Sequence, residues 1–400
     1  MPPLRHITLP AGFAAAGVHC GIKTSTQEDL AIVAAERDVA AAILTTRNQV
    51  VGAPVLWCRK VLPRGYGRVR GIVINSGNSN VCTGARGRRD AEEMARLTAS
   101  LLGTRHEKVL VASTGIIGHP LPMAKVRRGI RAAASRLGAA NDAAMLRAIM
   151  TTDTRPKSAV VQGRLSGKRI TLAGVVKGAG MIAPSLATMI AVLTTDAAVA
   201  PATLHKALKA AGERFNAITV DSDTSTSDTV VLLASGAAGN RPVASGTAAC
   251  RKFAAMLDEV CGELARAVVA DGEGATKLIE ITVRGARSDA DARAAAKTVA
   301  NSPLVKTAVH GGDPNWGRIL AALGRSTAKV DADKAAIRIG GAVVFTRGAG
   351  TQRNLRKVQA HLRGNEVTID CDLGLGRGRY TAMTCDLSRQ YVAINADYHT

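Results

Sequence analysis

Aromatic side chains are scarce in this chain of 400 residues, where phenylalanine, tryptophan and tyrosine together make up 2%. Because proteins stack nucleobases on aromatic rings, this scarcity argues against a binder of single-stranded nucleic acid. A formal net charge of +22 would otherwise suggest such a partner, but the 53 lysines and arginines are scattered, with only short clusters such as 86–89 and 127–131. We expect no nucleic-acid partner, and a positive field that attracts small anionic substrates.

Cysteines are few and show no paired spacing. There are seven, an odd number, and none forms a C-x-x-C pair. This argues against a disulfide framework or a zinc site and favours a reducing compartment. The first residues contain only a feeble apolar run, interrupted by Pro10 and Gly12, which is not the pattern of a signal peptide. We therefore expect a cytoplasmic protein.

Loops that bind nucleotides or calcium are also missing. The glycines of CDLGLGRGRY (371–380) alternate strictly, unlike the G-x-G-x-x-G order of a dinucleotide loop. The segment that starts DSDTS at Asp221 begins like a calcium loop. It fails at the sixth position, where Thr226 replaces glycine, and at the twelfth, where Leu232 replaces glutamate. We expect neither a metal nor a cofactor.

What the chain does have is 46% hydrophobic residues and enough length for two or three domains. Residues 21–55 suggest a hairpin whose polar turn is Glu36–Asp38. The further pattern alternates strands and helices without a regular βαβ rhythm. Strands are expected near 71–74, 109–112, 158–165, 169–176 and 278–283, and helices near 90–102, 122–137, 141–151, 201–214 and 247–270. The charged stretch after Gly285 is the candidate domain boundary.

The most informative stretch lies between Lys177 and Asp196, where eighteen residues carry no charge. Its first half, rich in glycine and other small residues, predicts a loop, and its second half predicts a buried strand that Thr188 opens. A threonine freed by cleavage of its preceding bond has a nucleophilic hydroxyl and an amine that can act as its base. Glycine, proline and hydroxyl residues argue against a membrane span. An ordinary loop entering a core strand remains the simple alternative.

KGAGMIAPSLATM (177–189) resembles the cleavage signature K-G-S-G-M-I-A-P-N-M-A-T-M of the ornithine acetyltransferase family, the bifunctional glutamate N-acetyltransferases. Members of that family cut themselves before the threonine. The stretches GIVINSGNSNVCTG (71–84), SPLVKTAVHGGDPNWGRILAALG (302–324) and YVAINADYHT (391–400) also resemble the family, so the matches run in order along nearly the whole chain. One departure is His310, where the family usually has phenylalanine.

The resemblance implies an α+β fold of the αββα sandwich type, with helices outside central sheets, a self-cleaving threonine nucleophile and a smaller C-terminal α/β domain. It divides the chain into fragments 1–187 and 188–400, which we expect to assemble as an α2β2 heterotetramer. The approximate structural division is 1–285 for the sandwich and 286–400 for the smaller domain.

The resemblance also assigns the site. It makes Thr188 the nucleophile, Ala187–Thr188 the cleaved bond, and Thr114 and Gly115 the oxyanion donors. For Thr114 the sequence itself adds a strand end that turns through S-T-G, a weak signal. Glu273 lies between two glycines, where its own pattern fits a solvated turn, but the resemblance makes it a ligand for an ammonium group. The implied substrate-binding residues are Thr154 (with Thr152 as the alternative within 151–154), Lys177, Thr188, Glu273, Asn395 and Thr400.

The implied reaction transfers an acetyl group from N2-acetylornithine to L-glutamate through an acetyl-threonine, a step of arginine biosynthesis. Acetyl-CoA stays open as a second acetyl donor. One rival is a self-processing aminopeptidase or amidase on a related fold, in which water or a peptide amine takes the place of glutamate. The other is a basic binding protein without catalysis, which would stay uncut and bind nucleic acid in a salt-sensitive way.

Overall fold

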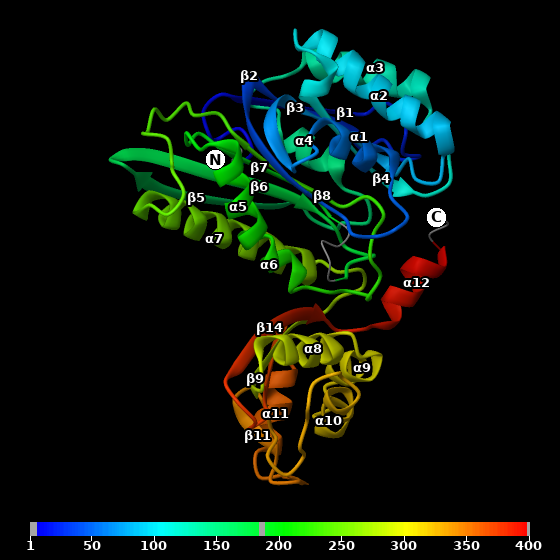
Figure 1. The fold of residues 1–400 in the computed structure, drawn as a ribbon. Helices are drawn as coiled ribbons and strands as arrows, with labels where there is room; N and C mark the ends of the chain where they lie inside the picture. The colour runs from blue at the N-terminus through cyan, green and yellow to red at the C-terminus, as the bar shows by residue number, and fades with distance from the viewer. Residues whose placement is uncertain (1–5, 184–188, 398–400) are drawn as a thin grey trace.

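The computed structural model describes residues 6–183 and 189–397, which form two units, each built around its own sheet (Figure 1). The larger unit has an eight-stranded sheet in the order β4-β3-β2-β8-β7-β6-β5, with β1 paired to β2 outside this path. Its strands are β1 (Phe13–Val18), β2 (Leu30–Thr45), β3 (Tyr66–Asn78), β4 (Val109–Ile116), β5 (Lys157–Leu165), β6 (Lys168–Lys177), β7 (Ile190–Thr195) and β8 (Thr229–Ala234).

The longest strand, β2, joins the two halves of this sheet. Its first part pairs with β1 and its second part with β8, and its register to β3 shifts between Ala34 and Val39. The expected hairpin around Glu36–Asp38 is therefore wrong. These polar residues form an irregularity within one continuous strand, and the chain does not reverse there. Such irregularities bend a strand and increase its twist.

Helices cover both outer faces of the larger unit (Figure 1). On one side lie α1 (Ala53–Val61), α2 (Gly84–Leu101), α3 (Met123–Ser135) and α4 (Asp142–Ile149), with the short η1 (His106–Lys108). On the other lie α5 (Pro201–Ala211), α6 (Glu213–Asn216) and α7 (Ala248–Ala270). Buried side chains of β7 and β8, such as Val192 and Val231, belong to the same cluster as Ile72 and Leu110 of β3 and β4. The two halves of the sheet therefore pack on each other, which confirms the α+β sandwich.

The smaller unit has a six-stranded sheet in the order β12-β11-β10-β13-β9-β14 and its own buried cluster. Its strands are β9 (Leu278–Ala286), β10 (Ala336–Ile339), β11 (Ala342–Thr346), β12 (Ala349–Gly350), β13 (Glu366–Asp372) and β14 (Gly378–Cys385). Its helices are α8 (Asp289–Ala300), α9 (Pro303–His310), α10 (Trp316–Gly324) and α11 (Leu355–Leu362). Since β9 pairs with β13 and β14, the units divide before Leu278, not after Gly285 as the charge pattern suggested.

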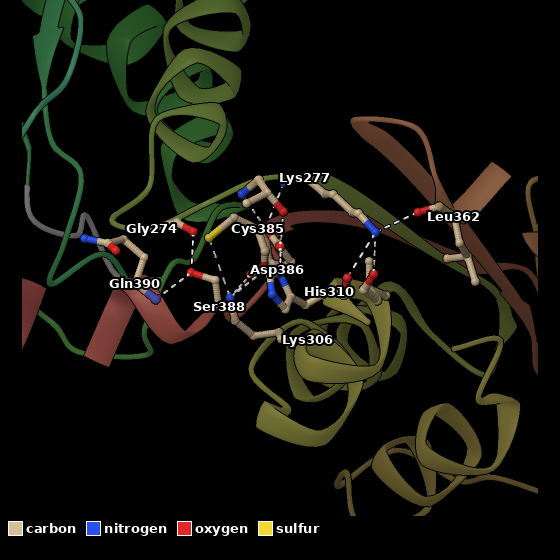
Figure 2. Close-up of polar contacts among 12 residues, drawn as sticks. Gly274, Lys277, Lys306, His310, Leu362, Cys385, Asp386, Ser388 and Gln390 are labelled. Carbon is tan, nitrogen blue, oxygen red and sulfur yellow. Dashed lines mark hydrogen bonds and ion pairs between the residues drawn. The ribbon is translucent and has the colours of Figure 1, made fainter. Parts of the chain in front are cut away.

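A buried lysine fastens the smaller unit to the larger one (Figure 2). The Lys306 side chain comes from α9 and is 4% exposed. Its Nζ donates to the carbonyl oxygens of Val220 at 2.7 Å and Cys385 at 2.6 Å, and to the hydroxyl of Thr384 at 2.9 Å. Val220 belongs to the larger unit, whereas Thr384 and Cys385 end β14. The ammonium group therefore joins α9, β14 and the larger unit at one point.

The chain then leaves β14 for the last helix, α12 (Arg389–Asp397), which runs back toward the larger unit (Figure 1). Asp386 accepts from the backbone nitrogen of Lys277 at 2.8 Å and contacts Nδ1 of His310 at 2.7 Å (Figure 2). Ser388 donates to the carbonyl oxygen of Gly274 at 2.6 Å. These contacts fix the direction in which α12 starts.

Among the described residues, no helix combines the length and the apolar character that a bilayer span needs.

Candidate active site

A pocket of about 130 Å³ lies where several strand ends meet. The carboxyl ends of β3, β4 and β6 face the amino ends of β7 and β8 there. The pocket is lined by residues at some of these strand ends, by segments next to strands and helices, by the loop before residue 184 and by α12: Ser79, Thr114, Gly115, Ile117, Thr151, Thr152, Lys177, Gly180, Met181, Ser225, Thr226, Ser227, Glu273 and Asn395.

The expected oxyanion donors lie at the end of β4. Thr114 and Gly115 both line the pocket, and the Thr114 hydroxyl accepts from Nζ of Lys177 at 3.1 Å. Gly115 has φ +127°, and a Cβ there would lie 2.4 Å from the carbonyl carbon of Gly77. Only glycine fits this close approach of β3 and β4. The strand end therefore presents a hydroxyl and an unobstructed backbone to the pocket.

Lys177 is the last residue of β6, and its side chain is buried. Burial lowers the pKa of its ammonium group, and the carboxylate of Asp153 opposes that change. Asp153 itself accepts from Nζ of Lys157 and the backbone nitrogen of Gly178, at 2.6 and 2.7 Å. Burial would raise the pKa of Asp153, but the charges of Lys177 and Lys157 outweigh it and hold the pKa at about 2. Lys177 thus lines the pocket as part of a set of mutually compensated buried charges.

Thr154, the first choice for a substrate ligand in this segment, does not line the pocket. Its hydroxyl and its backbone nitrogen both donate to the carboxylate of Asp271. The same carboxylate pairs with Lys157 at 2.5 Å, so Thr154 completes a buried charge network. Thr152, the alternative, lines the pocket with its neighbour Thr151. The structure therefore favours Thr152 over Thr154.

Glu273 is buried to 9% exposure, which does not fit a solvated turn. Its Oε2 accepts from Nδ2 of Asn395 on α12 at 2.8 Å, and its backbone nitrogen donates to Ala179 at 2.9 Å. A Cβ on Gly180 would lie 2.3 Å from the same carboxylate. Within the described part of the chain, no lysine, arginine or histidine forms an ion pair with Glu273. Its carboxylate therefore lines the pocket without a direct ion pair among these residues, and the charge of Lys177 interacts with it from the same pocket.

The segment that starts at Asp221, whose first residues resemble a calcium loop, has a structural role that was not predicted from the sequence. The carboxylate of Asp221 accepts from the backbone nitrogens of Met181 at 2.5 Å and Ile182 at 2.9 Å. Burial raises its pKa to about 6, although these backbone bonds counteract the effect. Asp221 therefore holds the segment that leads toward residue 184. Among residues 6–183 and 189–397, no group of three or more histidine, cysteine and acidic side chains is arranged to hold a metal ion.

Three predicted residues fall outside the described part of the chain: Ala187, Thr188 and Thr400. Next to this gap, Met189 is the first residue of the following segment, and its backbone nitrogen donates to Oδ1 of the buried Asp228 at 3.0 Å. The strand predicted to begin at Thr188 begins as β7 at Ile190. Thr114, Gly115, Lys177, Glu273 and Asn395 line one pocket. Their roles stay predictions, and Asp228 was missed.

Comparison with known proteins adds an independent finding. Residues 14–400 match the family model described as the ArgJ family. The chain is similar to "Arginine biosynthesis bifunctional protein ArgJ" of Geobacter sulfurreducens, with 47% identity over 395 residues that cover 97% of this chain and 99% of that protein. It is also similar to the protein of the same name from Symbiobacterium thermophilum, with 47% identity and 98% of each chain covered.

A solved structure supports the same relationship. The crystal structure of an arginine biosynthesis bifunctional protein argJ from Bacillus halodurans has a TM-score of 0.50 and 42% identity to this chain. The match covers 51% of this chain and 97% of that one.

Proposed function

Because this chain belongs to the ArgJ family, we propose that it is an acyltransferase of arginine biosynthesis that moves an acetyl group from N2-acetylornithine to L-glutamate. The observation that carries the proposal is the pocket that gathers Thr114, Gly115, Lys177, Glu273 and Asn395. These residues come from four distant parts of the sequence. Their meeting in one pocket with Gly180 and Met181, which precede the Ala187–Thr188 bond in the chain, supports a reaction at Thr188.

The charges of the pocket suit acetylornithine. Its side chain ends in an ammonium group, and the carboxylate of Glu273 is buried and forms no direct ion pair among the described residues. A charge-assisted hydrogen bond there is stronger than a neutral one. Asn395 already donates to Oε2 of Glu273, which orients the carboxylate. We assign the ammonium group to Glu273, and the polar groups of Lys177 and Thr152 to the rest of the substrate.

The reaction proceeds in two acyl transfers. The free amine of Thr188, with an ordinary pKa of about 8, takes the proton of its own hydroxyl as the oxygen attacks the acetyl carbonyl of acetylornithine. Thr114 and Gly115 stabilise the tetrahedral oxyanion. The C–N bond breaks, the proton goes to the departing amine, and ornithine leaves an acetyl ester on Thr188. The amine of glutamate then attacks this ester, which gives N-acetylglutamate and restores the hydroxyl.

Two further proposals concern a second acetyl donor and the assembly of the cleaved fragments. Acetyl-CoA would serve as a second donor by acylating the same hydroxyl, which requires no additional catalytic group. We also propose that fragments 1–187 and 188–400 remain associated and pair as an α2β2 heterotetramer. Strands β6 and β7 lie on opposite sides of the Ala187–Thr188 bond and are hydrogen-bonded along their length, which supports retention of both fragments after cleavage.

Two measurements, made on purified wild-type protein and on Thr188→Ala, test the proposal. Intact mass should show fragments 1–187 and 188–400, and Thr188→Ala should remain a single chain without activity. Ornithine release from N2-acetylornithine should depend on glutamate, with N-acetylglutamate formed in equal amount. Release at the same rate without glutamate would identify an amidase instead. A wild-type chain that is uncut yet active would contradict the nucleophile.

A further inference from the structure

A second pocket, of about 290 Å³, is lined by residues of α4, β5 and β6. From α4 come Asp142 and Leu146, which are four residues apart and therefore lie on one face of the helix. Ser158 of β5 and Val175 of β6 also line it, and they are direct partners in the antiparallel register of these strands. His6, the first described residue, lines it as well. None of these five residues lines the active-site pocket, so this cavity is a separate one.

The carboxylate of Asp142 is buried with one of its two oxygens unused. The residue is 3% exposed, and its Oδ2 accepts from the backbone nitrogen of His6 at 2.7 Å. The Thr8 hydroxyl lies 3.3 Å from the same oxygen, but its single proton has a closer acceptor, the carbonyl oxygen of Ala139 at 2.9 Å. Oδ1 has no hydrogen-bond partner among the described residues. Because buried polar atoms are nearly always bonded, Oδ1 indicates a donor from outside these residues.

The negative charge of Asp142 is also unpaired. Within residues 6–183 and 189–397, no lysine, arginine or histidine forms an ion pair with it. Arg147 lines the same pocket, but its guanidinium group is already bonded to the carboxylate of Glu28 at 2.6 Å. Asp142 is the first residue of α4, and this end of a helix stabilises a negative side chain. The pocket therefore holds one negative charge and favours a cation.

His6 provides a second acceptor for the same ligand. Its Nδ1 is buried and has no partner in the described part of the chain. Burial lowers the pKa of the ring, and the charge of Asp142 only opposes this, so the imidazole is neutral at pH 7. A neutral imidazole donates from one nitrogen and accepts at the other. With the proton on Nε2, the free Nδ1 accepts from a donor in the pocket.

The remaining lining restricts the ligand further. Leu146 and Val175 are buried aliphatic side chains, so part of the ligand is apolar. An anion would meet the charge of Asp142. A metal ion would find one carboxylate and one imidazole, and the described residues contain no group of three or more such side chains that could hold one. A primary ammonium group on a short aliphatic chain has the charge, the three donors and the apolar body. The volume is near the lower end for small-molecule sites, about 300 Å³.

We propose that this pocket is a binding site for a small aliphatic amine, whose ammonium group donates to Oδ1 of Asp142 and to Nδ1 of His6. The aliphatic chain of the amine packs on Leu146 and Val175. This site is distinct from the ammonium site that we assign to Glu273 in the active-site pocket. It does not depend on acetyl transfer, so a failure of the proposed function would leave it untouched.

The probe is n-butylammonium chloride, and 1-butanol, with the same chain and a neutral hydroxyl, is its control. Binding to the full chain is titrated by ligand-observed NMR in Glu273→Gln, which lacks the carboxylate that binds ammonium in the active-site pocket. This parent should bind butylammonium saturably and 1-butanol at least about 10-fold more weakly. Adding Asp142→Asn, which keeps an oxygen for the nitrogen of His6, should weaken butylammonium about 10- to 100-fold. The binding of 1-butanol should change little.

Ala143→Leu tests the same site without altering a buried residue. Ala143 lines the pocket from an exposed position of α4, so the larger side chain fills the pocket and not the core. It should abolish saturable binding of butylammonium in a protein that still folds, even if Asp142→Asn does not fold. The matched control is Ala210→Leu, at an exposed position of α5 that does not line this pocket, and it should bind like the parent.

Four results would overturn the inference. They are no saturable binding by the parent, equal affinity for butylammonium and 1-butanol, unchanged affinity in a folded Asp142→Asn, and unchanged affinity in Ala143→Leu. Arg5 precedes His6 and lies outside the described residues, so Arg5→Gln is tested in the same parent. We expect it to bind butylammonium as the parent does. Binding that appears only in Arg5→Gln would show that a cation of the chain itself pairs with Asp142, which refutes a small-molecule site.

Discussion

At the scale of single residues, the site depends on charges that are buried and compensated. Asp153 pairs with Lys157 at 2.6 Å and also lowers the cost of burying Lys177. Asp271 contacts Lys157 at 2.5 Å from the other side. Breaking a buried pair by removing one partner is strongly destabilising, because a charge is left alone. We therefore interpret this network as the support that holds Lys177 in place against Thr114.

This charge network makes the free energy of unfolding depend on pH in the acidic range. The pKa of Asp153 is about 2 in the folded protein and near 3.9 in an unfolded chain. A depressed carboxyl pKa stabilises the fold above the unfolded value, and this contribution is lost as pH falls toward 2. We expect wild type to lose about 2 kcal/mol from Asp153 between pH 5 and 2. Thermal unfolding across this range measures it. Asp153→Asn should be less stable at pH 7 and show a smaller acid dependence, and an unchanged dependence would contradict the assignment.

Thr114 supplies a second prediction at this scale. Thr114→Ala removes a hydroxyl that lines the pocket and bonds to Lys177. If that hydroxyl stabilises the oxyanion, turnover should fall about 100- to 1,000-fold, as for the loss of a comparable donor. Thr114→Ser, which retains the hydroxyl, is the matched control and should keep most activity. The comparison must use fully processed enzyme, and equal turnover in both variants would remove Thr114 from the oxyanion site.

Glu273→Gln tests the ammonium site. Glutamine keeps the shape and an acceptor for Asn395 but removes the charge. A hydrogen bond to a charged group contributes about 1.5–3 kcal/mol, so kcat/KM for N2-acetylornithine should fall about 10- to 100-fold. The variant should also lose the preference of wild type for acetylornithine over a neutral analogue that lacks the ammonium group. A preference equal in both proteins would show that Glu273 does not bind this group.

At the scale of elements, helices and core strands were predictable because their patterns are local. The helix expected near 247–270 is α7, which Thr247 caps by accepting from Cys250 and whose buried face follows helical periodicity. The long strand β2 was not predictable in the same way. Its polar Glu36–Asp38 segment has the composition of a turn, and only its pairing with β1 and β3 before the irregularity and with β3 and β8 after it makes it one strand. Pairing partners distant in sequence leave no local signal.

The same limit applies to the site. Motif resemblance found Thr114, Lys177 and Glu273, because each lies in a stretch of characteristic sequence. It could not show which of Thr152 and Thr154 lines the pocket. That depends on Asp271, which lies 117 residues beyond Thr154 in the sequence and accepts a hydrogen bond from the Thr154 hydroxyl. Asp228 was missed for a related reason. Its proximity to Met189 arises only when β7 and β8 align as parallel strands.

The loop before residue 184 yields a prediction at this scale. Gly180→Ala would place a methyl group 2.3 Å from the Glu273 carboxylate. Because that carboxylate is the end of a flexible side chain, it should move and the fold should persist. We expect a higher KM for N2-acetylornithine with little loss of stability. Gly324→Ala at the end of α10, where no atom lies within 4 Å of the new methyl, is the control and should leave KM unchanged. An unaltered KM in Gly180→Ala would show that the position of Glu273 is unimportant.

At the scale of the whole molecule, the two units meet close to the pocket. The smaller unit contributes no sheet residue to the site, yet β14 leads into α12, which carries Asn395 to Glu273. The direction of α12 is set by the hydrogen bond from the Ser388 hydroxyl to the carbonyl oxygen of Gly274 and by the contacts of Asp386 (Figure 2). We infer that the smaller unit serves the site as an anchor for α12.

Lys306 is the test of this arrangement, because its ammonium group is the buried point that joins both units. Lys306→Met keeps the length of the side chain but leaves the carbonyl oxygens of Val220 and Cys385 without their donor. Unsatisfied buried acceptors cost about 1–3 kcal/mol each, so the free energy of unfolding should fall by roughly 2–6 kcal/mol. Lys357→Met, an exposed position on α11 of the same unit, is the control and should be nearly neutral.

The effect of Lys306→Met on activity distinguishes an anchor from a purely structural joint. If the joint positions α12, loosening it should displace Asn395 from Glu273 and raise KM for N2-acetylornithine at temperatures where the protein is still folded. Chemistry at Thr114 and Gly115, which belong to the larger unit, should be affected less, so KM should change more than kcat. Asn395→Ala in the intact joint should reproduce the KM effect without the loss of stability. If kcat falls in Lys306→Met by as large a factor as KM rises, or if Asn395→Ala has normal kinetics, the smaller unit supports the fold without affecting substrate binding in the pocket.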